Sequence, residues 1–273
     1  EKQNSAWMDI SHPNYERWNR SRLLADERGR FVRSLISQKK DCRKLSVLDL
    51  GSGEGGTSRV FSDDNFVVSL DFSFDKLKRQ KSLCADCSMV NASALDLPFL
   101  PSGFDVIIMQ DVIEHIEGNL ISLPGELLKL LKPGGVIYLS TPNRHSLLNL
   151  LADPHWGLPF VSAMNRKTIR KFVLPAVRKQ DVGRTGIAQL LSLNDLKRLF
   201  GRSCKLELNT LFAVTKLFEG SRAIVWSSFH LSLLHIIKQL RLDHFILKLS
   251  NNSEGIVNKY FTPTFYFLIT PGE

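Results

Sequence analysis

The sequence predicts an α/β fold in which helices cover both faces of a doubly wound, mostly parallel sheet. Five apolar stretches of strand length occur between residues 46 and 140, and segments of helical pattern separate them. The first stretch runs into a turn with glycines at positions 51, 53, 55 and 56. The chain has 273 residues, of which 43% are hydrophobic, so it is long enough to bury one large core. Such alternation is typical of parallel strands whose carboxyl ends carry the ligand site.

The first 44 residues are expected to form a helical lid over that site. Residues 5–40 predict two helices, because apolar and aromatic side chains recur at helical spacing among charged ones. The recurring positions are Trp7, Tyr15, Trp18, Leu23, Leu24, Phe31, Val32, Leu35 and Ile36. The first thirty residues contain no apolar stretch of the kind found in signal peptides, so a cytoplasmic location is expected.

The segment VLDLGSGEGG, residues 47–56, predicts a strand, a turn of bare backbone and a short helix. Gly51 and Gly53 can adopt positive φ and leave no Cβ between the main chain and a ligand. Amide groups at the start of the helix then point at the ligand. Gly51, Gly53 and Gly56 also satisfy the dinucleotide pattern G-x-G-x-x-G. Asp49 at the end of the strand favours a cationic ligand over a pyrophosphate.

Residues 66–70 form the second predicted strand, and Asp71 follows at its tip. A carboxylate about 20 residues beyond the glycine turn can accept two hydrogen bonds from a ribose diol. This placement suits any cofactor that contains adenosine. A helix is expected next at residues 74–84, then a weak third strand at 88–90 and the turn SALDLPF at 93–99.

The fourth strand is expected at residues 104–109, which are apolar except for Asp105 and form a run typical of a strand buried on both faces. Asp111 and Glu114 come next, and we expect them in the first turn of a helix whose dipole they complement. The helix should continue to residue 131, where the segment LKPGG ends it. A fifth strand should follow at residues 136–140.

These motifs, taken in order, resemble the class I S-adenosylmethionine-dependent methyltransferases. The likeness covers about residues 45–142 and includes the glycine turn, Asp71, LPF at 97–99, FDVII with the pair EH at 114–115, and LKPGG. Within that class it is similar to the small-molecule branch that contains the ubiquinone-biosynthesis methyltransferases. The resemblance implies a seven-stranded, Rossmann-like sheet. Its sixth strand would lie at residues 205–211, and its last, at 261–270, would run antiparallel.

The resemblance also implies that the cofactor is S-adenosylmethionine. Gly51, Ser52 and Gly53 would hold its methionine part, with Asp49 shaping the turn and facing the ammonium group. Asp71 would bind the ribose hydroxyls.

The remaining cofactor contacts implied by the resemblance come from the third and fourth strands. Ala94 and its neighbours would flank the adenine, and Gln110 would contact the cofactor from below. Many relatives have an aspartate where this chain has Ser93. Ser93 can still hydrogen-bond near the adenine edge, but without the strength of a charged acceptor.

Two insertions are expected to choose the acceptor within a methyltransferase domain of residues 45–273. The first, about residues 143–190, would cap the acceptor pocket. The second, about residues 212–258, contains the apolar but basic stretch 222–249. This stretch predicts either a helical pair packed on the core or on a dimer partner, or an interfacial helix on a membrane that supplies a lipid-like acceptor.

Methyl transfer to a hydroxyl requires removal of a proton, and the candidate bases are His155, His115, Asp111 and His145. His155 is preferred because it lies in the cap beside Trp156. No metal is expected at the site. Asp111 and Asn143 occupy positions from which catechol-type methyltransferases bind magnesium, but Pro142 stands where another acidic ligand would be needed.

Three other functions stay open at this point. The net charge of +9 suits a nucleic-acid methyltransferase, but residues 110–113 lack the N/D-P-P-Y/F motif of the amino-methylating enzymes, so nucleic acid is not the expected partner. A nicotinamide-dependent oxidoreductase would share the glycine pattern without explaining LPF or LKPGG. A cofactor-binding scaffold without catalysis is the third alternative. Cys84 and Cys87 are expected to be two thiols near a helix end.

Overall fold

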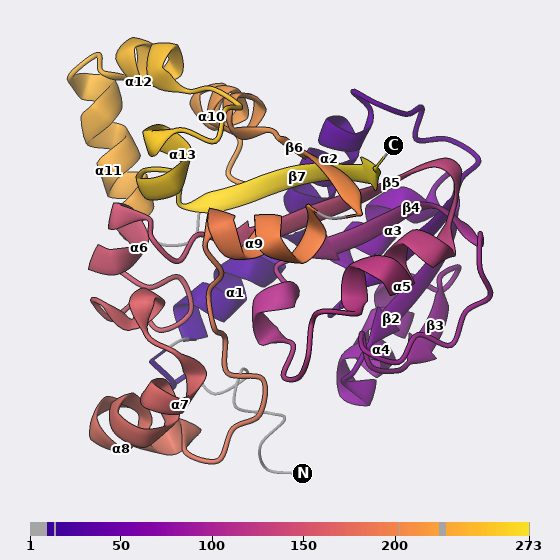
Figure 1. Ribbon diagram of the computed structural model, residues 1–273. Helices are drawn as coiled ribbons and strands as arrows, with labels where there is room; N and C mark the ends of the chain where they lie inside the picture. The colour runs from indigo at the N-terminus through magenta and orange to yellow at the C-terminus, as the bar shows by residue number, and fades with distance from the viewer. Residues whose placement is uncertain (1–9, 14, 202, 224–227, 273) are drawn as a thin grey trace.

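The computed structural model describes residues 10–13, 15–201, 203–223 and 228–272, and its centre is a seven-stranded sheet (Figure 1). The strands lie in the order β3-β2-β1-β4-β5-β7-β6. Their bounds are β1 Ser46–Leu50, β2 Phe66–Asp71, β3 Ser88–Asn91, β4 Phe104–Gln110, β5 Leu131–Pro142, β6 Cys204–Leu208 and β7 Thr264–Pro271. The first five strands pair in parallel, whereas β7 runs antiparallel to both β5 and β6. The predicted fold class is therefore confirmed.

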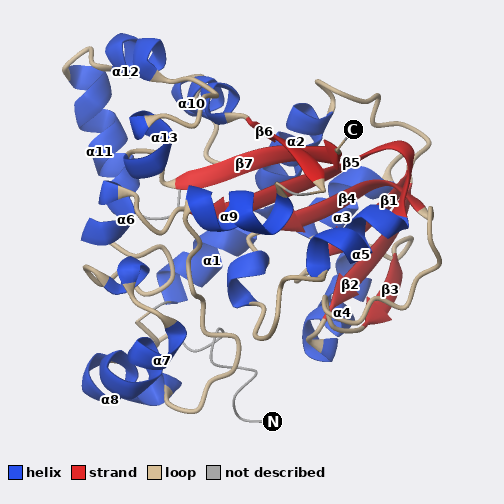
Figure 2. Cartoon of the chain, in the orientation of Figure 1, coloured by secondary structure: helices blue, strands red, loops and turns tan. Residues whose placement is uncertain are grey.

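Helices cover both faces of this sheet (Figure 2). Those that precede β5 are α1 Tyr15–Leu23, α2 Ala25–Ile36, α3 Gly56–Ser62, α4 Phe74–Leu83, the 3-10 turn η2 Ile113–His115 and α5 Leu123–Leu130. Those that follow it are α6 Leu147–Leu151, η3 Val161–Ala163, α7 Arg166–Thr168, η4 Ile169–Val173, α8 Leu174–Val177, η5 Lys179–Asp181, α9 Leu193–Phe200, α10 Thr210–Phe218, α11 Ser228–Gln239, α12 Asp243–Leu249 and α13 Ile256–Tyr260. Among the described residues, no helix is long and apolar enough to cross a membrane.

The central strands are mostly apolar because successive side chains enter two different cores. In β4, Ile107 and Met109 pack in one cluster with α5 and α9, while Val106 and Ile108 pack in the other with α2 and α3. Side chains alternate between the two faces of a strand, so a strand covered on both sides is apolar at most positions. This double burial fixes β1 and β4 side by side at the centre of the sheet.

The helix predicted at residues 111–131 is wrong. The chain makes only the short turn η2 after β4, crosses a loop and begins α5 at Leu123. Gly118, in that loop, has φ of 144°, which no helix contains. Pro124 lies in the first turn of α5, where its missing amide hydrogen costs nothing. The LKPGG segment belongs to β5, which begins at residue 131 rather than at 136.

The last two strands are shorter than predicted at the two ends that flank the second predicted insertion. The sixth strand ends at Leu208 rather than at residue 211, because α10 begins at Thr210. The last strand begins at Thr264 rather than at 261. The buried Asn143 explains the second change, since its Nδ2 donates to the carbonyl oxygen of Thr262 at 2.8 Å and holds that segment as a turn.

Cys84 and Cys87 form a disulfide, so the expectation of two thiols is wrong. Their sulfurs meet because Cys84 caps the end of α4 and the chain then turns, with the amide of Cys87 donating to the carbonyl oxygen of Cys84 at 3.4 Å. Cys42 and Cys204 are buried and free.

The predicted N-terminal helices are present as α1 and α2, although Trp7 and the side chain of Trp18 lie outside the described residues. Helix α2 shares a core with β1 through Phe31, Val32, Leu35 and Ile36. A lid of residues 1–44 therefore stays a prediction, because α2 packs into this core.

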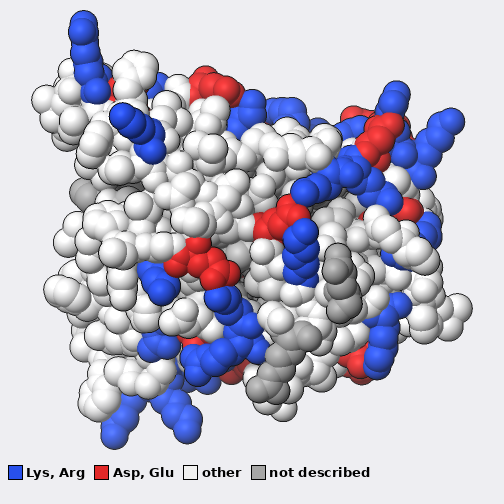
Figure 3. All heavy atoms as spheres, turned by 45° about the horizontal axis from the view of Figure 1, so that its top comes forward, with Lys and Arg blue, Asp and Glu red and all other residues white. Residues whose placement is uncertain are grey.

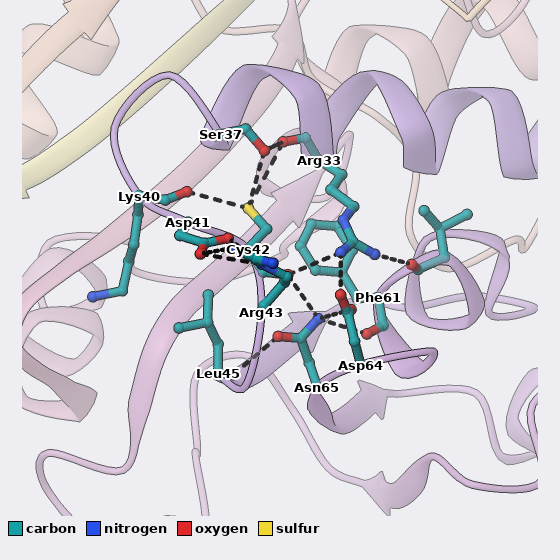
Figure 4. A network of polar contacts seen from close by, with 11 residues as sticks. Arg33, Ser37, Lys40, Asp41, Cys42, Arg43, Leu45, Phe61, Asp64 and Asn65 are labelled. Atoms are coloured by element: carbon teal, nitrogen blue, oxygen red, sulfur yellow. Dashed lines mark hydrogen bonds and ion pairs between the residues drawn. The ribbon is translucent and has the colours of Figure 1, made fainter.

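Polar contacts fasten the loop after α2 to the start of β1 (Figure 4). Arg33 donates to Asp64 at 2.6 Å and to the carbonyl oxygen of Cys42 at 3.0 Å. Asn65 donates to the same carbonyl at 3.1 Å and accepts from the amide of Leu45 at 2.9 Å. These contacts fix the direction in which β1 delivers the glycine turn.

Candidate cofactor and acceptor site

The glycine turn after β1 is closed on one side and open on the other. Gly51 and Gly53 have φ of 77° and 59°, the left-handed region that glycine adopts without strain. A Cβ on Gly51 would lie 2.4 Å from Cγ2 of Val112, whereas a Cβ on Gly53 would meet nothing within 4 Å. The turn after β4 is thus packed directly on Gly51, and the backbone at Gly53 has room beside it for a ligand.

A chain of hydrogen-bonded polar side chains connects Asp49 to the glycine turn. Ser58 donates to Asp49 at 2.6 Å, Ser69 donates to Ser58 at 2.8 Å, and Gln80 donates to Ser69 at 2.6 Å. Ser52 completes the chain by donating to Gln80 at 3.0 Å. Burial raises the pKa of Asp49 to about 6. Asp49 is thus linked to the glycine turn only through other side chains, and its role in shaping the turn and its contact with a ligand ammonium stay predictions.

Asp71 joins the glycine turn to the turn after β2. Its Oδ2 accepts the amide of Gly53 at 2.9 Å, and its Oδ1 accepts the amide of Ser73 at 2.7 Å. Each carboxylate oxygen keeps a further lone pair that could accept a hydroxyl hydrogen. The side chain is buried, so its orientation is set before any ligand arrives.

The residues predicted beside the adenine and below the cofactor are also held by local contacts. Ser93 accepts the amide of Leu95 at 3.1 Å, and Ala94 packs at the margin of the core. Gln110 accepts a hydrogen bond from Thr57 at 2.7 Å, so the end of β4 is tied to the first turn of α3. All the predicted cofactor residues thus lie at the carboxyl ends of β1 to β4.

Asp111 is committed to an ion pair, which limits its use as a base. Its carboxylate pairs with Arg28 of α2 and accepts a hydrogen bond from Ser140 at 3.0 Å. Burial raises the pKa of Asp111, and Arg28 opposes that rise. Asp111 itself has φ of 55°, so the ion pair holds the backbone in a conformation that residues other than glycine rarely adopt. Sequence reasoning missed Arg28, which lies in a helix far from Asp111 along the chain.

The preferred candidate base, His155, and a second candidate, His115, lie together around Glu114. The rings of His115 and His155 pack edge to face with their centroids 4.9 Å apart. Nε2 of His155 lies 3.8 Å from Oε1 of Glu114, whose side chain is 0% exposed. Thr141 donates to Oε2 of Glu114 at 3.0 Å. Burial raises the pKa of Glu114 well above its ordinary range and lowers the pKa of His115 to about 4.

The cap brings His155 to this place. Asp153 accepts the amides of His155 and Trp156, each at 2.8 Å, and so forms a local turn that presents the imidazole. Trp156 packs in a separate small core of the cap. Arg166 donates to the carbonyl oxygen of Glu114 at 3.0 Å and thereby fastens the cap to the turn after β4. His145, by contrast, is exposed.

The pair Asp111 and Asn143, which could have suggested magnesium, is not arranged to share an ion. Asp111 is paired with Arg28, and Nδ2 of Asn143 donates to backbone carbonyls of residues 258, 259 and 262.

Residues 15–203 match the model of a protein family described as a methyltransferase domain. The chain belongs to this methyltransferase family. The mostly parallel seven-stranded sheet is that of a class I methyltransferase, and the cofactor is S-adenosylmethionine. The nicotinamide-dependent alternative is thereby set aside.

Two curated methyltransferases and one solved structure illustrate the similarity. A ubiquinone biosynthesis O-methyltransferase from Caulobacter vibrioides is 27% identical over 195 residues, which are 63% of this chain and 72% of that protein. A demethylmenaquinone methyltransferase from Renibacterium salmoninarum is 28% identical over 137 residues, which are 50% of this chain but only 57% of that protein. An S-adenosylmethionine-dependent methyltransferase from Mesorhizobium loti has the same fold, with a TM-score of 0.54, 14% identity and coverage of 88% of this chain and 96% of its own.

Proposed function

We propose that the protein transfers a methyl group from S-adenosylmethionine to a hydroxyl, or to a carbon, of a small or lipid-linked acceptor. One observation carries the proposal: Val112 covers Gly51, while Glu114 and His115, two and three residues further on, meet His155 of the cap. The place for the cofactor and a group of proton-accepting side chains therefore belong to one continuous edge of the sheet. The names of the quinone-biosynthesis relatives support an aromatic acceptor.

In this proposal Gly51, Ser52 and Gly53 hold the methionine part of the cofactor, with Asp49 beneath them. The cofactor supplies a methyl group that is already activated as a sulfonium. The protein then has to place the acceptor in line with that group, exclude water and manage the acceptor's proton.

The adenosine part would be bound by Asp71, through the ribose, and by Ser93, Ala94 and Gln110. His155 and His115 would face the acceptor hydroxyl. Asp111 would act as a positioning residue, since it is already paired with Arg28 and hydrogen-bonded to Ser140.

A cofactor titration followed by a transfer assay tests the function. Calorimetry should show binding of S-adenosylmethionine, or of its demethylated product, and no binding of NADH. Incubation with labelled cofactor and fractions of a cell extract should label a small or lipid-extractable molecule. Cofactor binding without transfer to any fraction would favour the scaffold alternative. Labelling of RNA would contradict the proposed acceptor class.

We further propose that the acceptor is reached at an anionic membrane surface through the helices α11 to α13. Their exposed apolar side chains are Leu231, Ile236, Leu240, Leu242, Phe245, Leu249, Ile256, Tyr260 and Phe261. Lys238 of α11 and Lys248 of α12 are exposed, as is Arg241 in the connection between these two helices. Figure 3 shows this part of the surface as largely uncharged, with a few basic side chains on it. Apolar area combined with positive charge is what an interfacial helix needs at anionic lipid.

The protein should therefore float with vesicles that contain phosphatidylglycerol and not with vesicles of phosphatidylcholine alone. Changing Lys238, Arg241 and Lys248 to Glu should weaken this binding by roughly 100-fold or more, because each basic residue near an anionic surface contributes about 1 kcal/mol. Changing the exposed Lys76, Lys78 and Lys81 of α4 to Glu makes the same charge change elsewhere and should have a much smaller effect. A dimer that buries α11 to α13, with no flotation, would contradict the membrane proposal.

A further inference from the structure

Three side chains with ligand atoms converge where the cap meets the turn after β4. Glu114 and His115 come from η2, and His155 comes from the cap. One nitrogen or oxygen of each residue lies within 4.8 Å of the other two. This grouping brings distant parts of the chain together, and none of the three side chains is more than partly exposed.

The carboxylate of Glu114 is the first sign that something belongs between them. Its Oε2 accepts from Thr141, but its Oε1 is buried and receives no hydrogen bond within the part of the chain that the structure describes. No Lys or Arg among these residues forms an ion pair with it either; Arg166, which reaches this turn, donates to the backbone carbonyls of residues 114 and 116 instead. A buried carboxylate oxygen without a donor is costly unless a cation or a proton occupies the place beside it.

The orientation of His115 is the second sign. Its Nδ1 lies 2.9 Å from the carbonyl oxygen of Gly186, and because a carbonyl can only accept, Nδ1 carries the hydrogen. The lone pair of the neutral ring is then on Nε2. Histidines that bind metals are usually held in this way, with the other ring nitrogen donating to a carbonyl or a carboxylate.

We propose that Glu114, His115 and His155 bind a divalent metal ion, and that its remaining coordination positions take the acceptor's hydroxyl oxygen. Two imidazoles and one carboxylate suit zinc and other first-row ions, and three protein ligands leave a position open for substrate. Ligands at about 2.0–2.1 Å from a tetrahedral ion are about 3.3 Å apart, so the ligand atoms need to close by up to about 1.5 Å. The chain can supply this by small rotations of partly exposed imidazoles.

The inference rests on the proposed function and refines it. A hydroxyl bound to a divalent ion loses its proton more readily, just as metal-bound water does. The O–H bond breaks and its proton passes to solvent; the oxygen then forms the new O–CH₃ bond as the S–CH₃ bond of the cofactor breaks and the sulfonium becomes a neutral thioether. The metal ion is neither oxidised nor reduced. His155 is then a ligand that places the acceptor rather than the base that removes the proton.

Zinc titration of the full chain, stripped of metal with a chelator, tests the site. Calorimetry with ZnCl₂ alone should show one tightly bound ion for each chain. His155→Ala and Glu114→Gln should each weaken that binding by roughly 100-fold or more, because each removes a ligand atom. His145→Ala is the matched control, since His145 is exposed and outside the cluster, and it should bind zinc as the unchanged protein does.

Binding of S-adenosylmethionine by the same variants separates the two proposals. Retained cofactor binding with lost zinc binding supports the metal site and shows that the variants fold. No zinc binding by the unchanged protein, or zinc binding that survives both His155→Ala and Glu114→Gln, overturns the metal site and leaves a proton on Glu114 as the explanation of its buried oxygen. If the unchanged protein does not bind S-adenosylmethionine, the proposed function itself is contradicted.

Discussion

Gly51→Ala should abolish measurable binding of S-adenosylmethionine while leaving a destabilised but folded protein. The new Cβ would lie 2.4 Å from Cγ2 of Val112, and Gly51 has φ of 77°. A left-handed backbone conformation costs an alanine about 1–2 kcal/mol, and overpacking costs about 1–3 kcal/mol more. Relief of this clash must move the glycine turn or the turn after β4, and both line the proposed site. Calorimetric titration with the cofactor and thermal unfolding measure the two effects.

Two further variants show whether the clash with Val112 is the cause. Gly134→Ala introduces a methyl group at φ of 72° with nothing within 4 Å, so it should cost only the backbone strain and leave cofactor binding unchanged. Val112→Ala removes both methyl groups that the new Cβ would meet, and in the double variant it should restore part of the lost stability and affinity. A double variant no better than Gly51→Ala would contradict the packing argument.

The central strands could be predicted from the sequence because their burial leaves little choice of residue. In β1 and β4, Leu48 and Ile107 enter one core while Val47 and Val106 enter the other, so both strands are apolar at most positions. The glycine turn was predictable for a related reason, since Gly51 needs both positive φ and the absence of a Cβ.

The segment after β4 was mispredicted because its apolar spacing continues through a break. Ile116, Leu120 and Leu123 pack at the core as a helix would place them, yet the loop conformation of Gly118 separates η2 from α5. Hydrophobic spacing reports which side chains face the core, and it does not report the backbone between them.

The contacts of the candidate site could be predicted only in part. His155 and His115 were both candidate bases, but their meeting at Glu114 depends on the path of the cap. That path is set by the turn at Asp153 and by the hydrogen bonds of Arg166 to backbone carbonyls. Interactions of side chains with distant backbone leave no periodic trace in a sequence, so they became visible only in the fold.

Asp71→Ala should lower cofactor affinity by roughly 100-fold or more, the largest effect expected from removal of a single carboxylate. Its two oxygens accept the amides of Gly53 and Ser73, at 2.9 and 2.7 Å, so the substitution removes the proposed ribose contact and also frees both turns. Each lost hydrogen bond to a charged acceptor costs about 1.5–3 kcal/mol, and the melting temperature should fall as well. Asp63→Ala is the control, because Asp63 is an exposed aspartate at the end of α3.

Asp71→Asn distinguishes the two roles of this carboxylate. The asparagine side chain keeps one oxygen that can accept an amide hydrogen, but its NH₂ group faces the other amide and cannot accept from it. Asp71→Asn should therefore recover part of the stability that Asp71→Ala loses. It should recover less of the cofactor affinity, because in the proposal the ribose hydroxyls bind the same carboxylate oxygens that accept the backbone amides. Equal affinity in the unchanged protein and in both variants, measured by calorimetry, would show that the ribose binds elsewhere. If Asp71→Asn binds the cofactor as tightly as the unchanged protein does, and Asp71→Ala does not, the charge of the carboxylate contributes nothing to the affinity and its geometry is sufficient.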